Sequence, residues 1–141
     1  MRRVVAVVSV LFAACASPPR AAAPEGPASS STCSSVEACA AEVSRDPTDP
    51  HLRVRWGRAL EVAGRASAAA REFRAAIRLA TDPVAAIDEA ADGLMRLGDA
   101  PGCVAELDVQ LAGAERVPAL AVALRRARER CAEAAKKAAP I

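Results

Sequence analysis

The chain is 141 residues long, carries a formal net charge of +2, and is 52% hydrophobic with only 2% aromatic residues. Without Arg2 and Arg3 the 19 basic residues fall to 17, which equals the number of acidic ones. A neutral chain lacks the positive surface that nucleic-acid binding requires, so no nucleic-acid partner is expected. Alanine dominates the hydrophobic content, and strands favour aromatic and β-branched residues, so the composition predicts an all-α fold of closely packed helices.

Residues 1–14 are expected to be a signal peptide. Two arginines precede an uncharged apolar run, Val4 to Ala14, which is too short for a membrane span of about 20 residues. The run ends in Leu-Phe-Ala-Ala-Cys, which resembles a bacterial lipobox and implies acylation of Cys15. Phe12 departs from the leucine that is usual in that motif. Ordinary cleavage beside the cysteine, which would release a soluble periplasmic or secreted protein, is the alternative.

The lipobox resemblance implies an exported protein that is anchored by lipid in the outer membrane and faces the periplasm. Ala16 supports this, because it is not the aspartate that commonly retains lipoproteins at the inner membrane. Residues 15–32 are rich in proline, alanine and serine, a composition that buries little surface and predicts an extended tether. The folded domain is therefore expected over residues 33–139.

A repeat period marks the folded part of the chain. Gly64 and Gly98 are 34 positions apart, and each follows a stretch of apolar residues at helical spacing. Asp49-Pro50 and Asp82-Pro83 are 33 positions apart. Glycine suits the left-handed residue that ends a helix, and aspartate followed by proline is typical of a helix start. The spacing predicts a repeated unit of helix, tight turn and helix.

Apolar residues keep helical spacing between these marks and predict four buried stripes. The stripes are Leu52, Trp56, Leu60 and Ala63; Ala69, Phe73, Ala76 and Ile77; Ile87, Ala90, Ala91, Leu94 and Leu97; and Cys103, Leu107, Val109 and Leu111. A capping box with Ser34 as the cap and Glu37 three residues on predicts a short preceding helix that reaches about Arg45. A long last helix is expected from Pro118, which brings the predicted number to six.

The segment from Asp49 to Ala114 resembles the tetratricopeptide repeat. The resemblance rests on a small residue in the first helix of each unit and on a small-x-x-x-large pattern in the second: Trp56-Gly57-x-x-Leu60 with Ala69-x-x-x-Phe73, then Ala90-Ala91-x-x-Leu94 with Cys103-x-x-x-Leu107. Gly57 and Ala91 are expected where two helices cross closely. Leu60 and Gln110 depart from the family pattern, and a generic alanine-rich helical bundle is the alternative.

The resemblance implies a groove that is lined by the first helix of each unit and binds a protein or peptide partner. The groove residues carried over are His51, Val54, Arg58, Glu61, Asp88, Asp92, Met95 and Arg96, with Arg126 and Arg130 as an extension from the last helix. The asparagine and lysine set with which some family members clamp a C-terminal carboxylate is missing. The alternative is that these residues are solvated charges on a short scaffold.

Four cysteines remain besides Cys15, namely Cys33, Cys39, Cys103 and Cys131. An even number in an oxidising compartment predicts two disulfides. The helical interpretation favours Cys103–Cys131, because the midpoint of that pair falls at the turn beside Pro118, and it leaves Cys33 and Cys39 flanking the first turn of the first helix. Zinc-ligand and C-x-x-C spacings do not occur, so no metal and no cofactor are expected, and free thiols are the alternative.

The residues do not form a catalytic pattern. The single histidine, His51, stands beside a helix-starting proline, the serines lack a G-x-S-x-G elbow, and no glycine-rich phosphate loop follows a strand. The sequence therefore predicts a non-enzymatic scaffold or adaptor without a small-molecule substrate. Two alternatives stay open: a structural or assembly subunit of a larger outer-membrane complex, and a periplasmic thiol-redox protein.

Overall fold

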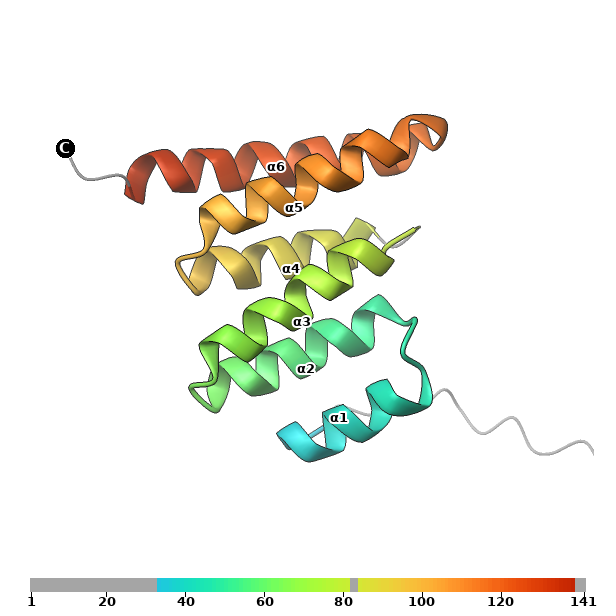
Figure 1. Ribbon diagram of the computed structural model, residues 1–141, viewed down its shortest axis with the longest axis vertical. Coiled ribbons are helices and arrows are strands. Elements are labelled where there is room, and N and C mark those ends of the chain that lie inside the picture. Colours follow the sequence, from blue (N-terminus) through green and yellow to red (C-terminus); the bar gives the residue numbers. More distant parts are fainter. Residues whose placement is uncertain (1–32, 82–83, 139–141) are drawn as a thin grey trace, which may run out of the picture. The chain divides into compact units, whose positions relative to one another are not determined.

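The computed structural model describes residues 33–81 and 84–138. The predicted signal peptide, the acylation site Cys15, the tether and the Asp82-Pro83 helix start lie outside the described residues. Within the described ranges every regular element is a helix, so the predicted all-α class is confirmed (Figure 1). The elements are α1 (Val36–Arg45), α2 (Pro50–Val62), α3 (Ala66–Leu79), α4 (Val84–Arg96), α5 (Ala100–Gly113), the 3₁₀ turn η1 (Ala114–Arg116) and α6 (Pro118–Ala138).

Polar side chains fix the start of three helices. Ser35 caps α1, because its hydroxyl accepts a hydrogen bond from the amide of Ala38 at 3.1 Å. The predicted cap, Ser34, was therefore wrong by one residue: Ser35 has the extended backbone that directs a cap hydroxyl to the amide three positions on. Asp49 caps α2 as predicted, and Asp99 caps α5 by accepting from the amide of Gly102 at 3.2 Å.

Two turns of the same geometry end α2 and α4. Gly64 and Gly98 have φ values of 71° and 75°, in the left-handed region that glycine enters without steric cost. Each glycine amide donates to the carbonyl three residues back at 3.0 Å, and the next amide donates to the carbonyl five residues back at 2.9 Å. This pair of hydrogen bonds is the Schellman motif of a helix C-terminus. The two glycines that indicated a repeat in the sequence therefore also adopt the same backbone geometry.

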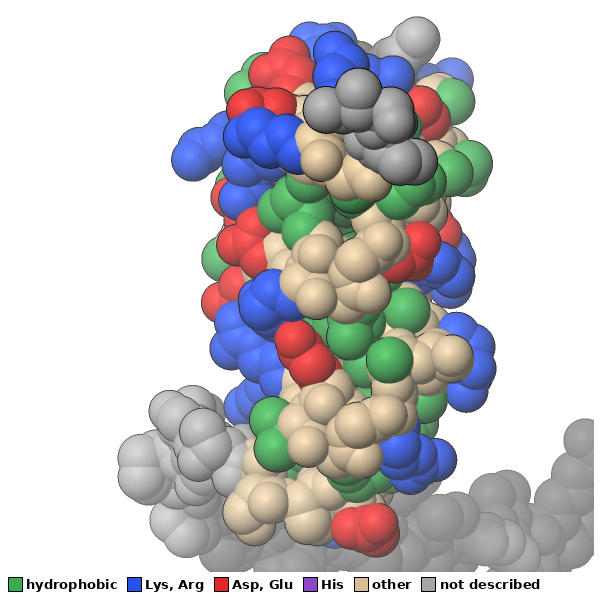
Figure 2. All heavy atoms as spheres, turned by 90° about the vertical axis from the view of Figure 1, so that its left-hand side faces the viewer, with side chains coloured by type: hydrophobic (Ala, Val, Ile, Leu, Met, Phe, Trp, Pro, Cys, Tyr) green, Lys and Arg blue, Asp and Glu red, His purple; other side chains and the backbone are tan. Residues whose placement is uncertain are grey.

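The helices stack as two hairpins, α2 with α3 and α4 with α5, and α6 packs on α4 and α5 (Figure 1). Between the two hairpins α3 packs on α4, and further contacts join α2 to α4 and α3 to α5; α4 in turn packs on α6. We call α2, α4 and α6 the first-helix layer. Helix α1 packs against α2 at the other end of the stack. Figure 2 shows the edge at which both glycine turns lie, with apolar side chains surfacing between charged groups.

The predicted stripes form most of the core. The stripe on α3 is fully buried, as are Ile87, Leu94 and their alanine neighbours on α4 and Leu107 on α5. For two members of the predicted stripes the prediction of burial was wrong. Val109 is 66% exposed, because it lies two residues past buried Leu107 and so points to the far side of α5. Ala63 is exposed because α2 has already ended at Val62.

Phe73 is enclosed by two glycines from the first-helix layer. The ring is 0% exposed. A Cβ added to Gly57 on α2 would lie 2.7 Å from the nearest ring carbon, and one added to Gly93 on α4 would lie 2.5 Å away. Both distances are shorter than carbon atoms tolerate. The close crossing predicted at Gly57 is therefore present, whereas the equally close approach at Gly93 was not predicted.

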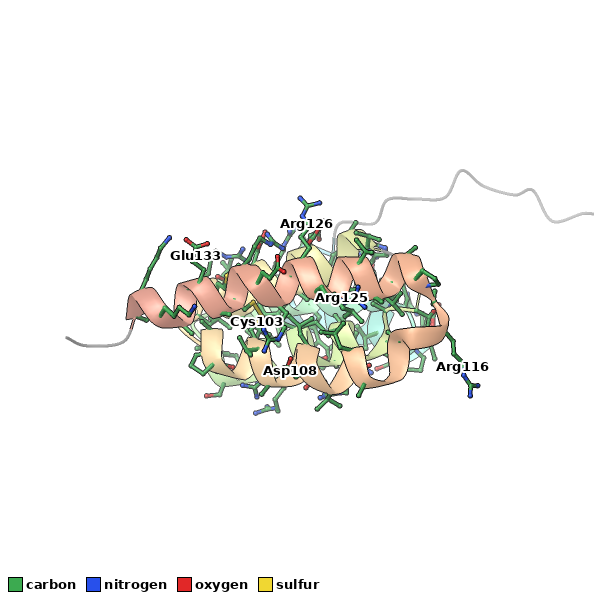
Figure 3. All side chains as sticks on the ribbon, turned by 90° about the horizontal axis from the view of Figure 1, so that it is seen from above. Cys103, Asp108, Arg116, Arg125, Arg126 and Glu133 are labelled. Atoms are coloured by element: carbon green, nitrogen blue, oxygen red, sulfur yellow. A yellow bond between two sulfur atoms is a disulfide. The ribbon has the colours of Figure 1, made fainter. Side chains whose placement is uncertain are left out.

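Both predicted disulfide pairings are present. Cys33 is bonded to Cys39 with a Cα–Cα distance of 5.1 Å, and Cys103 is bonded to Cys131 with a Cα–Cα distance of 6.0 Å. The second bond joins α5 to α6, and Cys103 lies between these two helices in Figure 3. The antiparallel register predicted from the midpoint of the pair is therefore correct.

Candidate functional site

The predicted groove residues map to the first-helix layer, with two corrections. Val54 is only 1% exposed and belongs to the core, because it shares the buried side of α2 with Gly57 and Leu60 at a spacing of three residues. Met95 is partly buried and packs against the core. The polar members of the set, by contrast, lie at or near the surface. The candidate site therefore contains fewer residues than the sequence predicted, and most of them are charged.

Two ion pairs connect α2 with α4. The guanidinium of Arg96 donates two hydrogen bonds, each 2.9 Å long, to the two carboxylate oxygens of Glu61. Arg58 lies 3.2 Å from the carboxylate of Glu89. The hydrogen bonds from Arg96 hold the pKa of the Glu61 carboxyl below its usual value, and the same bonds raise the pKa of Arg96. These pairs tie the two hairpins together at their outer surface.

A second set of ion pairs connects α4 with α6. One guanidinium, that of Arg130, donates to Asp88 at 2.7 Å and to Asp92 at 2.8 Å. Asp88 and Asp92 are four residues apart and therefore share one face of α4. The sequence prediction placed Arg130 only as an extension of the groove. In the structure it is the direct partner of two predicted groove residues.

These pairs link charged side chains across the surface of the first-helix layer, three arginines with four carboxylates. The four pairs join Arg58 to Glu89, Arg96 to Glu61, and Arg130 to Asp88 and Asp92. Each side chain involved keeps between 23% and 50% of its surface exposed. Exposed pairs contribute less than about 1 kcal/mol each. Their main effect here is to hold long side chains in fixed positions on one face.

Two of the predicted groove residues with polar side chains stand outside this network. His51 is exposed in the first turn of α2, two helical turns before Arg58, where the sequence predicted a solvated residue. Arg126 is exposed on α6, and Figure 3 places it with Glu133 on the edge of that helix away from α5. These two side chains mark the opposite ends of the first-helix layer.

The other helices have ion pairs of their own. Arg78 on α3 lies 2.7 Å from Glu106 on α5, and Arg74 on α3 is paired with the α5 cap Asp99. Helices α5 and α6 are joined in the same way by Asp108 and Arg128. Cross-helix pairing of charges is thus a general feature of the stack, and in the first-helix layer the pairs run from α2 through α4 to α6.

The described residues contain no group of three or more His, Cys, Asp or Glu side chains placed to hold a metal ion. Across the same residues, none of the helices combines the length and the apolar character needed to span a bilayer. Three of the four bonded cysteines are nearly inaccessible: Cys39 is 1% exposed, and Cys103 and Cys131 are 0% exposed. What the layer offers chemically is an array of positioned hydrogen-bonding groups.

No protein family, curated protein or solved structure matches this chain.

Proposed function

We propose that this protein is a non-enzymatic scaffold of the tetratricopeptide-repeat type that binds a protein or peptide partner on its first-helix layer. The observation that carries the proposal is the series of ion pairs that fixes side chains on α2, α4 and α6 as one surface. Side chains that are already held in place lose little conformational entropy when a partner binds. Stacked helical hairpins present extended surfaces of this kind to other proteins.

The recurring turn geometry supports the family assignment within this proposal. The paired glycine turns, the close crossing of Gly57 over Phe73, and a hairpin stack closed by one last helix agree with the residues on which the resemblance rests. In such arrays the terminal helix has one side solvated. Helix α6 has this character, because Leu124, Ala127 and Cys131 are buried while its other side carries exposed charge.

We further propose that the scaffold is tethered to the cell envelope, in the outer membrane, through acylation of Cys15. Two or three acyl chains would anchor a soluble domain stably, since each buried CH₂ contributes about 0.8 kcal/mol. Cys15→Ser is expected to move the protein from the membrane fraction to the soluble fraction. Metabolic labelling with a palmitate analogue should mark the wild type and not this variant. Label on the variant would contradict acylation at Cys15.

The binding surface is tested by exchanging an ion pair rather than breaking it. Glu61→Arg combined with Arg96→Glu keeps the pair and reverses its direction on the first-helix layer. The matched control is Arg78→Glu combined with Glu106→Arg, which does the same between α3 and α5. Affinity purification from detergent-solubilised membranes should recover the same partner with wild type and control, and lose it with the first-helix exchange. Recovery with all three proteins would refute the assignment of the surface.

An assembly subunit is the second candidate, and the complete pairing of the charges on α4 with neighbouring helices favours it. In that function the ion pairs serve only to hold the stack rigid, and another surface makes the contact. The exchange experiment separates the two candidates, because an assembly subunit would keep its partner in both exchanged proteins. The low exposure of Cys39, Cys103 and Cys131 argues against a thiol-redox function.

A further inference from the structure

The side of α6 that faces away from the stack carries a regular series of residues, which we call the outer stripe. Its members are spaced alternately by four and three positions, which places them on one face of the helix. They are Pro118, Val122, Arg125, Glu129, Ala132 and Lys136. All are exposed except half-buried Ala132, and Val122 keeps 61% of its surface exposed. The opposite face holds the buried residues Leu124, Ala127 and Cys131.

Two charged members of the outer stripe form no ion pair within the described part of the chain. Neither Arg125 nor Glu129 makes a salt bridge or a side-chain hydrogen bond with another described residue, although the two are four positions apart. The nearby Arg128 and Arg130, by contrast, are paired with acidic residues of α5 and α4. Figure 3 looks onto α6 from this end of the stack and shows Arg125 between Arg126, on the edge of the helix, and α5.

The order of side chains along the outer stripe is complementary to its own reverse. When the stripe is laid antiparallel on an identical helix, opposite charges meet and small apolar groups meet: Arg125 with Glu129, Val122 with Ala132, and Pro118 with the aliphatic stem of Lys136. Each pair is centred on position 127, near the middle of α6, so the two helices overlap along almost their whole length. Two-fold symmetry makes every one of these contacts twice.

We propose that this protein forms a symmetric dimer in which two copies of α6 pack antiparallel through their outer stripes. A second copy fits because three successive pairs along the stripe match at one register. A parallel arrangement would place Arg125 on Arg125 and Glu129 on Glu129, and like charges in contact oppose binding. The dimer goes beyond the scaffold function, because the outer stripe contains none of the predicted groove residues and none of the ion pairs of the first-helix layer.

The contact is expected to be weak in solution and specific in register. Exposed ion pairs contribute little individually, and valine and alanine bury only a small apolar area. Charges that must lie opposite each other nevertheless select one arrangement. Anchoring to one membrane would raise the effective concentration of the two copies. That gain rests on the proposed acylation of Cys15, whereas dimerisation at high protein concentration in solution does not.

The test is sedimentation equilibrium of the purified full chain carrying Cys15→Ser, over a wide range of protein concentration. A monomer–dimer equilibrium is expected. Arg125→Glu and Glu129→Arg should each raise the dissociation constant at least tenfold, and the two changes combined in one chain should restore it. The matched control is Arg71→Glu, which reverses an exposed charge on α3 and should leave the dissociation constant unchanged.

Mixing the two single variants tests the antiparallel register directly. A chain with Arg125→Glu carries two acidic groups at these positions, and a chain with Glu129→Arg carries two basic ones. Each should be monomeric alone, and the mixture should form heterodimers, because every facing pair then joins opposite charges. Circular dichroism should give the same helix content for all variants, since the native side chains at both positions are exposed.

Three outcomes would overturn the dimer: a monomer at every concentration, equal weakening by Arg125→Glu and Arg71→Glu, or a mixture of the single variants that stays monomeric. The first would exclude a second copy as the occupant of the outer stripe, and the other two would exclude this surface or this register. The exchange of Glu61 with Arg96 leaves the outer stripe intact. Failure of the dimer and failure of the scaffold can therefore be told apart.

Discussion

The two hairpins of this protein share one turn geometry but are held together in different ways. In the first hairpin the aromatic ring of Phe73 fills the space between helices and is enclosed by Gly57 and Gly93. The equivalent position in the second hairpin, 34 residues on, is Leu107, and Cys103 replaces the small residue Ala69. Cys103 is bonded to Cys131 on the last helix.

This difference shows two ways in which an alanine-rich array of helices can be stabilised. Each hairpin lies between the other hairpin and one terminal helix, α1 for the first and α6 for the second. In the first hairpin the large ring on α3 reaches the glycines of both α2 and α4. In the second hairpin the buried residue at the equivalent position is the smaller Leu107. A covalent bond there compensates for the smaller apolar contact, because it restricts the unfolded chain rather than adding packed surface.

The largest expected effect is the loss of the ring in the first hairpin. Phe73→Ala should lower the free energy of unfolding by about 3–5 kcal/mol, because it removes a fully buried aromatic side chain and leaves a cavity. Leu107→Ala should cost less, near the lower end of about 2–5 kcal/mol. Urea denaturation followed by circular dichroism measures both, with exposed Val109→Ala as a control expected to change stability by less than about 0.5 kcal/mol. A larger loss for Leu107→Ala would reverse the comparison.

Removing the covalent bond of the second hairpin should have the next largest effect. Cys103→Ala with Cys131→Ala opens a link across 28 residues, which chain entropy values at about 3.5 kcal/mol. The corresponding change at Cys33 and Cys39 should cost about 2.4 kcal/mol, because the loop is shorter. Hydrogen exchange should show α6 losing protection before α2 and α3 do. Uniform loss of protection along the chain would contradict a local role for this bond.

A methyl group placed against the ring should destabilise the first hairpin more moderately. Gly93→Ala is expected to cost about 1–3 kcal/mol through overpacking, although alanine favours a helix over glycine by about 1 kcal/mol. Gly113→Ala is the matched control, because nothing lies within 4 Å of a Cβ at that position. Combining Gly93→Ala with Phe73→Leu should cost less than the sum of the two single changes. Strict additivity would show that the ring and the glycine do not interact.

The smallest expected effect concerns the pH dependence of the pair Glu61–Arg96. The Arg96 guanidinium holds the pKa of Glu61 below its usual value of 4.5. The pair therefore stabilises the folded state above about pH 4.5, and this contribution is lost as the pH falls through the lower folded-state pKa. Glu61→Gln should reduce stability at pH 7 by less than about 1 kcal/mol, and by less still at pH 3. An equal deficit at both values would contradict this linkage.

Local signals explain why much of the fold could be predicted from the sequence. A left-handed turn needs glycine, so Gly64 and Gly98 revealed both turns and the period between them. Disulfide pairing followed from helix lengths, because two cysteines at equal distances from a turn face each other in an antiparallel hairpin. The wrong cap at Ser34 shows the limit of such signals, since adjacent serines offered two starts for the same helix.

Contacts between hairpins could not be predicted, because they depend on how each helix is rotated in the stack. The pairing of Arg130 with Asp88 and Asp92 joins positions about 40 residues apart in sequence, and many other arginines could have taken its place. The approach of Gly93 to Phe73 was missed for the same reason. The burial of Val54 was not predicted, because the family resemblance assigned this residue to the groove. In the structure the rotation of α2 about its axis directs the side chain into the core.

The most direct test of the scaffold proposal is site-specific photocrosslinking in cells. A benzoylphenylalanine is placed at His51 or Arg126, which are exposed at the two ends of the first-helix layer, and for comparison at Arg71 on α3 or Val109 on α5. The proposal predicts that both first-helix positions capture the same partner and that the comparison positions do not capture it. Capture from α3 and α5 with none from α2 and α6 would contradict a binding surface on the first-helix layer.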